Sequence, residues 1–277
     1  MKRKIILMSL FITGLLIFSY PIISNFFSEK EHHSVMSEHN KTLKEMTKKE
    51  KDKERNKAKE YNKELNEEPI LVEDPFAENQ TITESDSYHN VLDVGETIGS
   101  IEIPKLKVNL PIYHGVGEDV LQQGVGHMSN SSFPVGGEGS HTALTAHRGL
   151  PSSKLFRDLD KINEGDMFLI KALDETLAYQ VDDVKIVLPT NTEWLEMKQD
   201  KDYVTLITCE PYMINTHRLL VRGERVPYNP DKEITIPKSD DNFKMILIIS
   251  LIIIVIVGIS IKLYLNKRKT AKRDYYE

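Results

Sequence analysis

The central part of the sequence predicts an all-β domain, of barrel or sandwich type, between two apolar segments. From residue 98 onward, short runs that alternate apolar and polar residues are interrupted by Gly, Pro and Asn, which is typical of strands joined by turns. These runs follow one another at short spacing, as they do in β-barrels and β-sandwiches. An apolar run lies near each end of the 277-residue chain, and each has about the 20 residues that cross a bilayer.

The N-terminal apolar run, residues 5–27, predicts a membrane anchor or signal over residues 1–28. It follows three basic residues, Lys2 to Lys4, as the core of a signal peptide or an anchor does. Because no A-x-A cleavage site follows the run, a retained anchor is the favoured interpretation. A cleaved signal peptide is the alternative.

The C-terminal apolar run predicts a transmembrane helix over residues 244–265, after a polar linker over residues 231–243. A basic tail, residues 266–277, follows it. Basic residues flank the outer end of both apolar runs, and such flanks are retained in the cytoplasm. We therefore expect both termini in the cytoplasm and residues 29–243 outside the cell membrane.

Residues 29–68 predict a charged helical stalk. Lys, Glu, Asn and His dominate this segment, which contains neither Gly nor Pro. This composition offers little to bury, so a solvated helix and a disordered segment are both open, with a coiled coil of poor heptad pattern as a third interpretation. Ala58, Tyr61 and Leu65 recur at helical spacing, which predicts that this end of the stalk docks on the β domain.

The β domain is expected over residues 81–230, with a short helical insertion at residues 152–165. Pro lies inside several of the predicted strand segments, which indicates edges or bends. The strands are expected within five segments, 99–115, 139–149, 165–189, 202–211 and 217–226.

Charge and composition exclude several classes of function. The net charge of −6 argues against a nucleic-acid partner. Residues 134–139, PVGGEG, have no Lys-Ser or Lys-Thr after them, so they predict a turn, and no cofactor is expected. Cys209 is the only cysteine and cannot form an intramolecular disulfide. Three interpretations are open at this point: a buried inert thiol, an intermolecular disulfide and a reactive thiol.

Cys209 lies at the end of a predicted strand. In the segment VTLITCEPY, Thr205, Ile207 and Cys209 share one side of the strand, and Pro211 stops the ladder. A strand end is a rigid place from which to present a nucleophile. Arg218 opens the predicted return strand, so a hairpin brings it near the thiol.

A thiol needs a base or a positive neighbour to become a useful nucleophile. His141 and His147 are the histidines carried by a predicted strand. An extended strand separates them by about 20 Å, too far for both to bind one zinc ion with Cys209, so no metal site is expected. His147, at the end of its strand, is the candidate base, and His127 and His217 are expected to have structural or surface roles.

Three motifs now stand together: TLITC at Thr205 to Cys209, LTAHRG around His147, and RLLVRG beginning at Arg218. In this combination the sequence resembles the sortases, cysteine transpeptidases of Gram-positive bacteria, over about residues 61–226. The resemblance implies that Cys209, His147 and Arg218 are the catalytic residues. It also implies a closed, eight-stranded β-barrel, which the strand pattern alone does not.

Further segments resemble class C, the pilin-polymerising sortases. They are YNKEL, PVGGEGSH and the second transmembrane helix at the C-terminus. Residues 69–80 resemble the class C lid, since they carry Asp74, Pro75 and Phe76. We hypothesise that the lid's acid pairs with Arg218 while its aromatic ring covers the thiol. An ordinary linker turn is the alternative.

Glu210 departs from the class C pattern, which has Thr or another small residue at this position. Its carboxylate adds negative charge beside the thiol and could tune its pKa or the substrate preference. The plainer expectation is a side chain that points to solvent.

The resemblance implies a specific reaction without a cofactor. Cys209 attacks the Thr carbonyl of an LPxTG-type sorting signal and forms a thioester. His147 is the general acid and then the general base, and Arg218 holds the substrate or stabilises the oxyanion. In class C the acceptor is a pilin Lys amine, which gives an isopeptide bond.

Two other functions were weighed. A housekeeping sortase uses a cell-wall amine to attach proteins to peptidoglycan, but the lid and the second anchor argue against it. A non-enzymatic surface protein would end in a sorting signal, and IPKSDD before the last apolar run has that layout. However, Ile236 and Asp240 stand where LPxTG has Leu and Gly.

Overall fold

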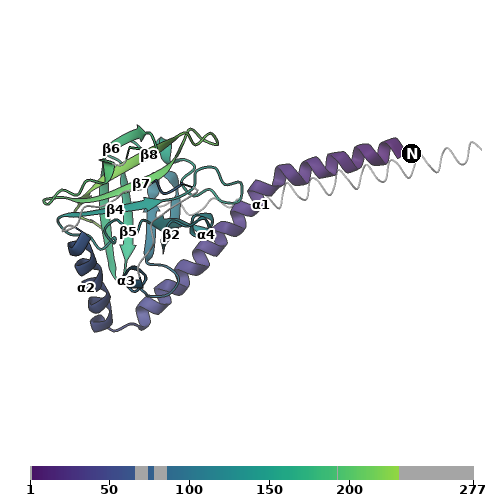
Figure 1. Cartoon of the computed structure of the whole chain (residues 1–277). Helices are drawn as coiled ribbons and strands as arrows, with labels where there is room; N and C mark the ends of the chain where they lie inside the picture. Colours follow the sequence, from purple (N-terminus) through teal and green to yellow (C-terminus); the bar gives the residue numbers. More distant parts are fainter. Residues whose placement is uncertain (1, 66–73, 78–85, 192, 231–277) are drawn as a thin grey trace, which may run out of the picture. The chain divides into compact units, whose positions relative to one another are not determined.

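A computed structural model of the chain describes residues 2–65, 74–77, 86–191 and 193–230. Eight strands close into a barrel in the order β1-β2-β3-β4-β7-β8-β6-β5 (Figure 1). This confirms both the all-β prediction and the closed, eight-stranded barrel. The strands are β1 (Gly99–Ile103), β2 (Val108–His114), β3 (Val125–His127), β4 (Ser140–Thr145), β5 (Met167–Ala172), β6 (Glu175–Val187), β7 (Asp202–Glu210) and β8 (His217–Val226).

Helices and 3-10 turns occupy the N-terminal part of the described chain and four connections of the barrel. The predicted helical insertion at residues 152–165 contains only the short 3-10 turn η2 within a series of turns. The helices are α1 (Lys2–Glu45), α2 (Lys48–Leu65), α3 (Asp86–His89) and α4 (Glu118–Gln123), and the 3-10 turns are η1 (Pro104–Leu106), η2 (Leu159–Lys161) and η3 (Glu193–Leu195).

Two of the strand pairings in the barrel are parallel, β2 with β3 and β4 with β7, and the others are antiparallel. Strand β3 is absent from the sequence prediction, because three residues carry no readable periodicity. A closed barrel has no edge strand for a proline. Pro111 of β2 is accommodated because the β3 pairing begins only at the next residue, Ile112.

The interior of the barrel is a single apolar cluster to which every strand contributes. On β7, Val204 and Leu206 belong to this interior cluster and are fully buried, whereas Ile207 belongs to a second cluster. This alternation follows from the two-residue period of a strand. The second, outer cluster comprises Val116, Leu121, Met128, Ala143, Leu195, Ile207 and Leu220, with Phe76, Val187 and Trp194 packed against it.

The predicted stalk is helical and more deeply docked than its composition suggested. Helix α1 runs without interruption across the expected boundary at residue 28. His32, Met36 and Leu43 are buried, and the His32 ring lies 2.7 Å from the carbonyl oxygen of Gln123. The anchor and the first part of the stalk are therefore one helix.

A second helix begins where Thr47 and Glu50 form a capping box. The Glu50 carboxylate accepts from the Thr47 backbone N–H at 2.7 Å, and Thr47 Oγ1 accepts from the Glu50 N–H at 3.3 Å. On helix α2, Ala58 is fully buried, and Tyr61 Oη donates to the carbonyl of Ser129. The predicted docking of this end of the stalk is confirmed.

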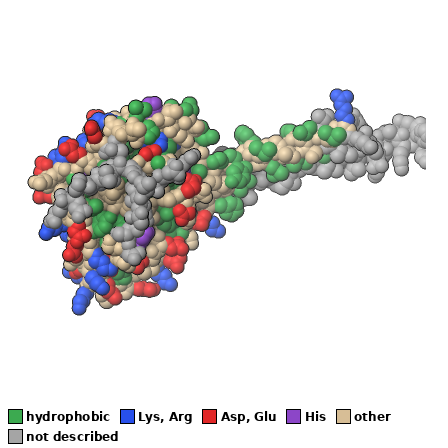
Figure 2. All heavy atoms as spheres, in the orientation of Figure 1, with side chains coloured by type: hydrophobic (Ala, Val, Ile, Leu, Met, Phe, Trp, Pro, Cys, Tyr) green, Lys and Arg blue, Asp and Glu red, His purple; other side chains and the backbone are tan. Residues whose placement is uncertain are grey.

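The first half of α1 carries the apolar surface expected of a membrane anchor. Among the described residues, one helical stretch, Met8–Glu45, is long and apolar enough to cross a membrane, with a mean hydropathy of 1.8 in its most apolar window. Leu16, Ile17 and Phe18 are 66–75% exposed, and Figure 2 shows apolar side chains along this part of the helix. The linker at 231–243, the helix expected at 244–265 and the tail at 266–277 lie outside the described residues.

Candidate active site

Cys209 lies at the outer face of the barrel, near the end of β7. Its position is two residues after Ile207, so the alternation of the strand points its side chain toward the outer cluster. In the antiparallel pairing of β7 with β8, Cys209 is directly opposite Arg218. The hairpin expected from the sequence therefore brings thiol and guanidinium together. Only 6% of Cys209 is exposed.

A parallel pairing that sequence analysis did not predict directs the segment carrying His147 toward Cys209. Strand β4 pairs with β7 in a register that ends at Thr145 opposite Ile207. Continuing this register by two residues brings position 147 opposite position 209. The two chains stay together past the ladder, since the Ala146 N–H donates to the Ile207 carbonyl at 3.2 Å.

One expectation about the histidines needs correction. His147 was expected at the end of its strand, but it lies two residues beyond the end of β4. His141 is 1% exposed, and its pKa is lowered to about 4 by burial. Its Nδ1 donates to the carbonyl of Glu196 at 3.0 Å, and its Nε2 accepts from Thr205 Oγ1 at 2.8 Å. His141 therefore has a structural role, as does the buried His127.

The two threonines of TLITC hold β7 to β4, a role that sequence analysis missed. Thr205 bonds His141 on β4, as described above. Thr208 is fully buried, and its Oγ1 donates to the carbonyl of Ala146 at 2.8 Å. These hydroxyls fix the strand on which Cys209 lies. Within the described part of the chain, no group of His, Cys, Asp or Glu residues could hold a metal ion.

The described part of the lid, residues 74–77, is a β-turn that contacts Arg218. Its Ala77 N–H donates to the Asp74 carbonyl at 3.1 Å, with Pro75 at the second position, where its fixed φ is favourable. The Asp74 carboxylate accepts from Arg218 Nε at 2.7 Å and from Arg218 Nη2 at 2.6 Å. This bidentate pair confirms the contact hypothesised from the sequence.

The pair is buried rather than exposed, with side-chain exposures of 9% for Arg218 and 13% for Asp74. Burial acts to lower the pKa of Arg218, but the hydrogen bonds that its guanidinium donates to Asp74 outweigh this effect, and the pKa is raised overall. Two further donations, from Arg218 Nη1 to the carbonyls of Asn215 and His217 at 3.0 and 2.9 Å, fix the guanidinium in place.

Phe76 inserts between two of the predicted catalytic side chains. Its ring centroid is 5.7 Å from that of His147 and 5.1 Å from the guanidinium carbon of Arg218. The ring also packs against the outer cluster. What remains beside the lid is a cavity of about 10 Å³ that Asp74, Pro75 and Arg218 help to line, which is about the volume of one water probe. The lid therefore fills the space at this site.

The thiol is neutral in this arrangement. Burial, with the Asp74 carboxylate, raises the pKa of Cys209 to about 11, although Arg218 and Arg148 act to lower it. A thiol of this pKa is almost wholly protonated at neutral pH and is a weak nucleophile. Arg218 and His147, the residues predicted to assist the thiol, are both in contact with the lid.

Three further charged residues lie near the site, and sequence analysis gave no role to two of them, Glu118 and Arg148. Glu118 Oε2, from the first residue of α4, is 3.3 Å from His147 Nε2. Arg148 is 5% exposed and forms an ion pair with Glu210. The expectation that Glu210 points to solvent is therefore wrong, because its carboxylate turns toward the buried guanidinium.

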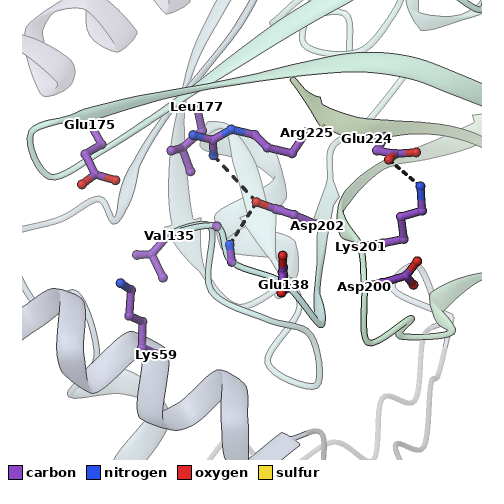
Figure 3. A pocket seen from close by; sticks show the side chains of 12 residues that line it. Lys59, Val135, Glu138, Glu175, Leu177, Asp200, Lys201, Asp202, Glu224 and Arg225 are labelled. Atoms are coloured by element: carbon purple, nitrogen blue, oxygen red, sulfur yellow. Dashed lines mark hydrogen bonds and ion pairs between the residues drawn. The ribbon is translucent and has the colours of Figure 1, made fainter. Parts of the chain in front are cut away.

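A larger cavity, of about 430 Å³, lies at the opposite end of the barrel and contains none of the predicted catalytic residues (Figure 3). It is lined in part by Asp202, the first residue of β7, whereas Cys209 is next to the last. Seven residues of strand separate the two positions by about 23 Å. Cavity size alone would therefore place the active site at the wrong end.

Known proteins match both this sequence and this structure. A model of the sortase domain matches residues 101–226. The structure of sortase C from Streptococcus pneumoniae is 45% identical, with a TM-score of 0.65 over 70% of this chain and 97% of that one. Sortase C-1 from Actinomyces oris is 43% identical, with a TM-score of 0.61 over 64% and 98% of the two chains. Sortase A of Streptococcus agalactiae is 28% identical over 80% of this chain and 83% of that protein.

This chain belongs to the sortase family, which are cysteine transpeptidases. Its structural neighbours with 41–45% identity are sortase C enzymes, from streptococci and from Actinomyces oris. The description of the Streptococcus pneumoniae enzyme refers to pilin substrate specificity, and that of a Group B Streptococcus enzyme calls it pilus-related. These likenesses support pilus polymerisation in general.

Proposed function

We propose that this sortase joins pilin subunits through isopeptide bonds. The observation that carries the proposal is the juxtaposition of Cys209 with Arg218 and His147 beneath a lid that engages both of the latter. Sortase C relatives that match the chain over most of their length add support.

The proposed reaction begins when the lid leaves the site. Cys209 transfers its proton to His147 and attacks the Thr carbonyl of an LPxTG-type sorting signal. The Thr–Gly bond breaks, His147 gives a proton to the departing Gly amine, and a thioester remains on Cys209. Arg218, released by Asp74, donates hydrogen bonds to the carbonyl oxygen, which is negative in the tetrahedral intermediate.

In the second half, a Lys amine of another pilin subunit attacks the thioester carbonyl. His147 takes the proton from this amine, the C–S bond breaks and Cys209 is regenerated. The peptide bond that is lost is replaced by an isopeptide bond of similar energy. The reaction therefore needs neither ATP nor a metal ion.

We place the catalytic barrel outside the cytoplasmic membrane of a Gram-positive bacterium, with both termini in the cytoplasm. The apolar surface of α1 and the basic residues before it support the N-terminal anchor. The C-terminal anchor rests on the apolar sequence of residues 244–265.

The test is reconstitution of the full-length chain in detergent micelles with a purified pilin that carries an LPxTG-type signal. We expect covalent ladders on denaturing gels and Lys isopeptide linkages by mass spectrometry. Cys209→Ala protein, in parallel, should give no ladder. If only a cell-wall peptide amine is accepted and no pilin–pilin bond forms, the chain is a housekeeping sortase and the proposal is wrong.

A further inference from the structure

An ion pair joins the residue after His147 to the residue after Cys209. Arg148 Nη1 donates to Glu210 Oε2, and the side chains are only 6% and 20% exposed. Both residues lie where the parallel register of β4 and β7, continued by three residues past its last pair, brings positions 148 and 210 opposite each other. The side-chain pair therefore links the two segments beyond the point where their backbone pairing ends.

The backbone pairing cannot extend to this point. Strand β4 ends at Thr145, and β7 is followed by Pro211, which has no N–H to donate. The last main-chain link between the two chains is the donation from Ala146 to Ile207. Beyond this bond, Thr208 Oγ1 still donates to the Ala146 carbonyl, and past His147 the link between the two segments is the Arg148–Glu210 pair.

Arg148 is itself anchored on its other side. Its Nη2 is 3.0 Å from the Asp160 carboxylate, and its Nε donates to the carbonyl of Arg157 at 3.2 Å. The loop that carries these partners also bonds to the candidate base directly, since the Phe156 N–H donates to the His147 carbonyl at 3.2 Å. Phe156 is fully buried. Arg148 thus connects the loop anchored by Phe156 to the end of β7.

We propose that Arg148 and Glu210 are positioning residues that hold His147 beside Cys209 for both proton transfers. The inference deepens the function proposed above and rests on it. Neither side chain is assigned contact with the substrate. The pair acts by setting the separation between the base and the thiol, to which proton transfer and nucleophilic attack are sensitive.

The sequence shows the pattern once the role is known. Two of the three candidate catalytic residues are each followed by a charged residue, His147 by Arg148 and Cys209 by Glu210, and these two charges are opposite in sign. The two charges meet only if the strands are parallel. In an antiparallel pairing with position 147 opposite 209, position 148 would be opposite 208 instead of 210.

The first test measures position without the reaction. In a His147→Cys variant, the introduced thiol and Cys209 are the only thiols, and neighbouring strands place them within disulfide range. Full-length protein in micelles is oxidised with diamide, and the intramolecular disulfide is followed by mass spectrometry. We expect Glu210→Gln, added to this variant, to slow disulfide formation several-fold.

The matched control is Glu224→Gln, which neutralises the partner of Lys201 near the other end of the same hairpin, where the ion pair is 2.6 Å long. It should leave the disulfide rate unchanged. Equal rates in the Glu210→Gln and Glu224→Gln backgrounds would overturn the positioning role.

The second test uses the enzyme with its own His147. Glu210→Gln keeps the shape of the side chain and should lower kcat for cleavage of an LPxTG peptide by about 10- to 100-fold, with little change in KM. Arg148→Lys keeps the charge but loses the planar fork, so it should lower kcat in the same way. Arg148→Gln combined with Glu210→Gln should be no slower than the slower single variant, because both changes break one link.

Melting temperatures distinguish a role in positioning His147 from a role in the stability of the fold alone. A variant that melts earlier but has the kcat of the wild type per folded molecule contradicts the proposal. If the wild type cleaves no sorting peptide while Glu210→Gln still slows the disulfide, the proposed function fails and the positioning pair stands. If the wild type cleaves the peptide and the variants cleave it equally fast, the pair fails and the proposed function stands.

Discussion

At the scale of single residues, Cys209 combines the position of a nucleophile with the protonation state of a resting thiol. The closed lid accounts for this, because burial and the Asp74 carboxylate together raise the pKa of Cys209 to about 11. Arg218 opposes the shift, yet its guanidinium is held by the same carboxylate. The reactivity of the thiol is therefore expected to depend on whether Arg218 is paired with Asp74.

Replacing the thiol tests its proposed role directly. Cys209→Ala should abolish thioester formation, since no other thiol exists in the chain. The melting temperature should change little, because the substitution removes one small, partly polar atom. The measurement is mass spectrometry of the protein after incubation with an LPxTG peptide. An acyl adduct on the Cys209→Ala protein would contradict the assignment.

Arg218 tests whether geometry or charge matters at the oxyanion position. Arg218→Lys preserves the charge but loses the paired N–H groups that Asp74 engages in the closed state. We expect kcat to fall by about 10²- to 10³-fold, as when one oxyanion donor is lost. Steady-state kinetics with an LPxTG peptide give this value. An Arg218→Lys enzyme with the kcat of the wild type would assign Arg218 an electrostatic role only.

At the scale of structural elements, we expect that displacing the lid from the site changes the pKa and the reactivity of Cys209. Asp74→Ala removes a negative neighbour and loosens the turn that covers the site, so the pKa of Cys209 should fall. At pH 8, below that pKa, a fall of one unit raises the thiolate fraction about tenfold. Cys209 should therefore react faster with iodoacetamide at pH 8, and the pH midpoint of labelling should shift downward.

The control for the lid is Asp166→Ala, which breaks a 2.6 Å ion pair with Lys105 outside the site. Its labelling rate should match that of the wild type. Phe76→Ala should act like Asp74→Ala, because its ring lies between His147 and Arg218. If both lid variants label at the wild-type rate, residues 69–80 are a connector and not a gate.

The docking of α2 depends on one buried amide. Asn62 Nδ2 donates to the Phe133 carbonyl at 3.1 Å, and its Oδ1 accepts from the Phe133 N–H at 2.7 Å. Asn62→Ala leaves the Phe133 N–H unpaired, whereas the Phe133 carbonyl keeps the Val135 N–H as a donor. The loss costs about 1–3 kcal/mol and lowers the melting temperature by roughly 3–10 °C. Lys63→Ala, at the next and exposed position, is the control. Equal melting of the two variants would show that α2 contributes little to stability.

At the scale of the whole molecule, buried neutral histidines predict a loss of stability in acid. Burial lowers the pKa of His127 to about 3 and that of His141 to about 4. Unfolding restores an ordinary pKa of about 6.5, so between these values the unfolded state binds more protons than the folded state. Stability should therefore fall as pH drops below about 6.5, and this contribution should level off near pH 3 to 4.

Each of these two histidines contributes a slope of up to about 1.4 kcal/mol per pH unit. Urea unfolding of the full-length chain in micelles at pH 7, 6 and 5 measures it. Since both groups are in the core rather than in the site, the wild type and Cys209→Ala should have the same slope. A free energy of unfolding that does not change between pH 7 and 5 would contradict the burial of neutral imidazoles.

Sequence reasoning predicted much of the fold and the residues of the candidate site from local patterns. Strand alternation is a property of neighbouring residues, so it indicated most of the barrel strands, and the position of Cys209 at the end of one of them. The spacing of Ala58 and Tyr61 likewise predicted the docked face of α2. The motifs around Cys209, His147 and Arg218 added the family, and with it the closure of the barrel.

What only the tertiary structure decided depends on contacts between distant segments. The parallel pairing of β4 with β7 brings His147 to Cys209, and no local pattern specifies which strands become neighbours in a barrel. Burial of the Asp74–Arg218 pair and the meeting of Arg148 with Glu210 follow from that pairing and from the fold of the lid. From sequence alone, a charged residue is expected to face solvent. Only the packed chain determines whether water or an opposite charge faces its side chain.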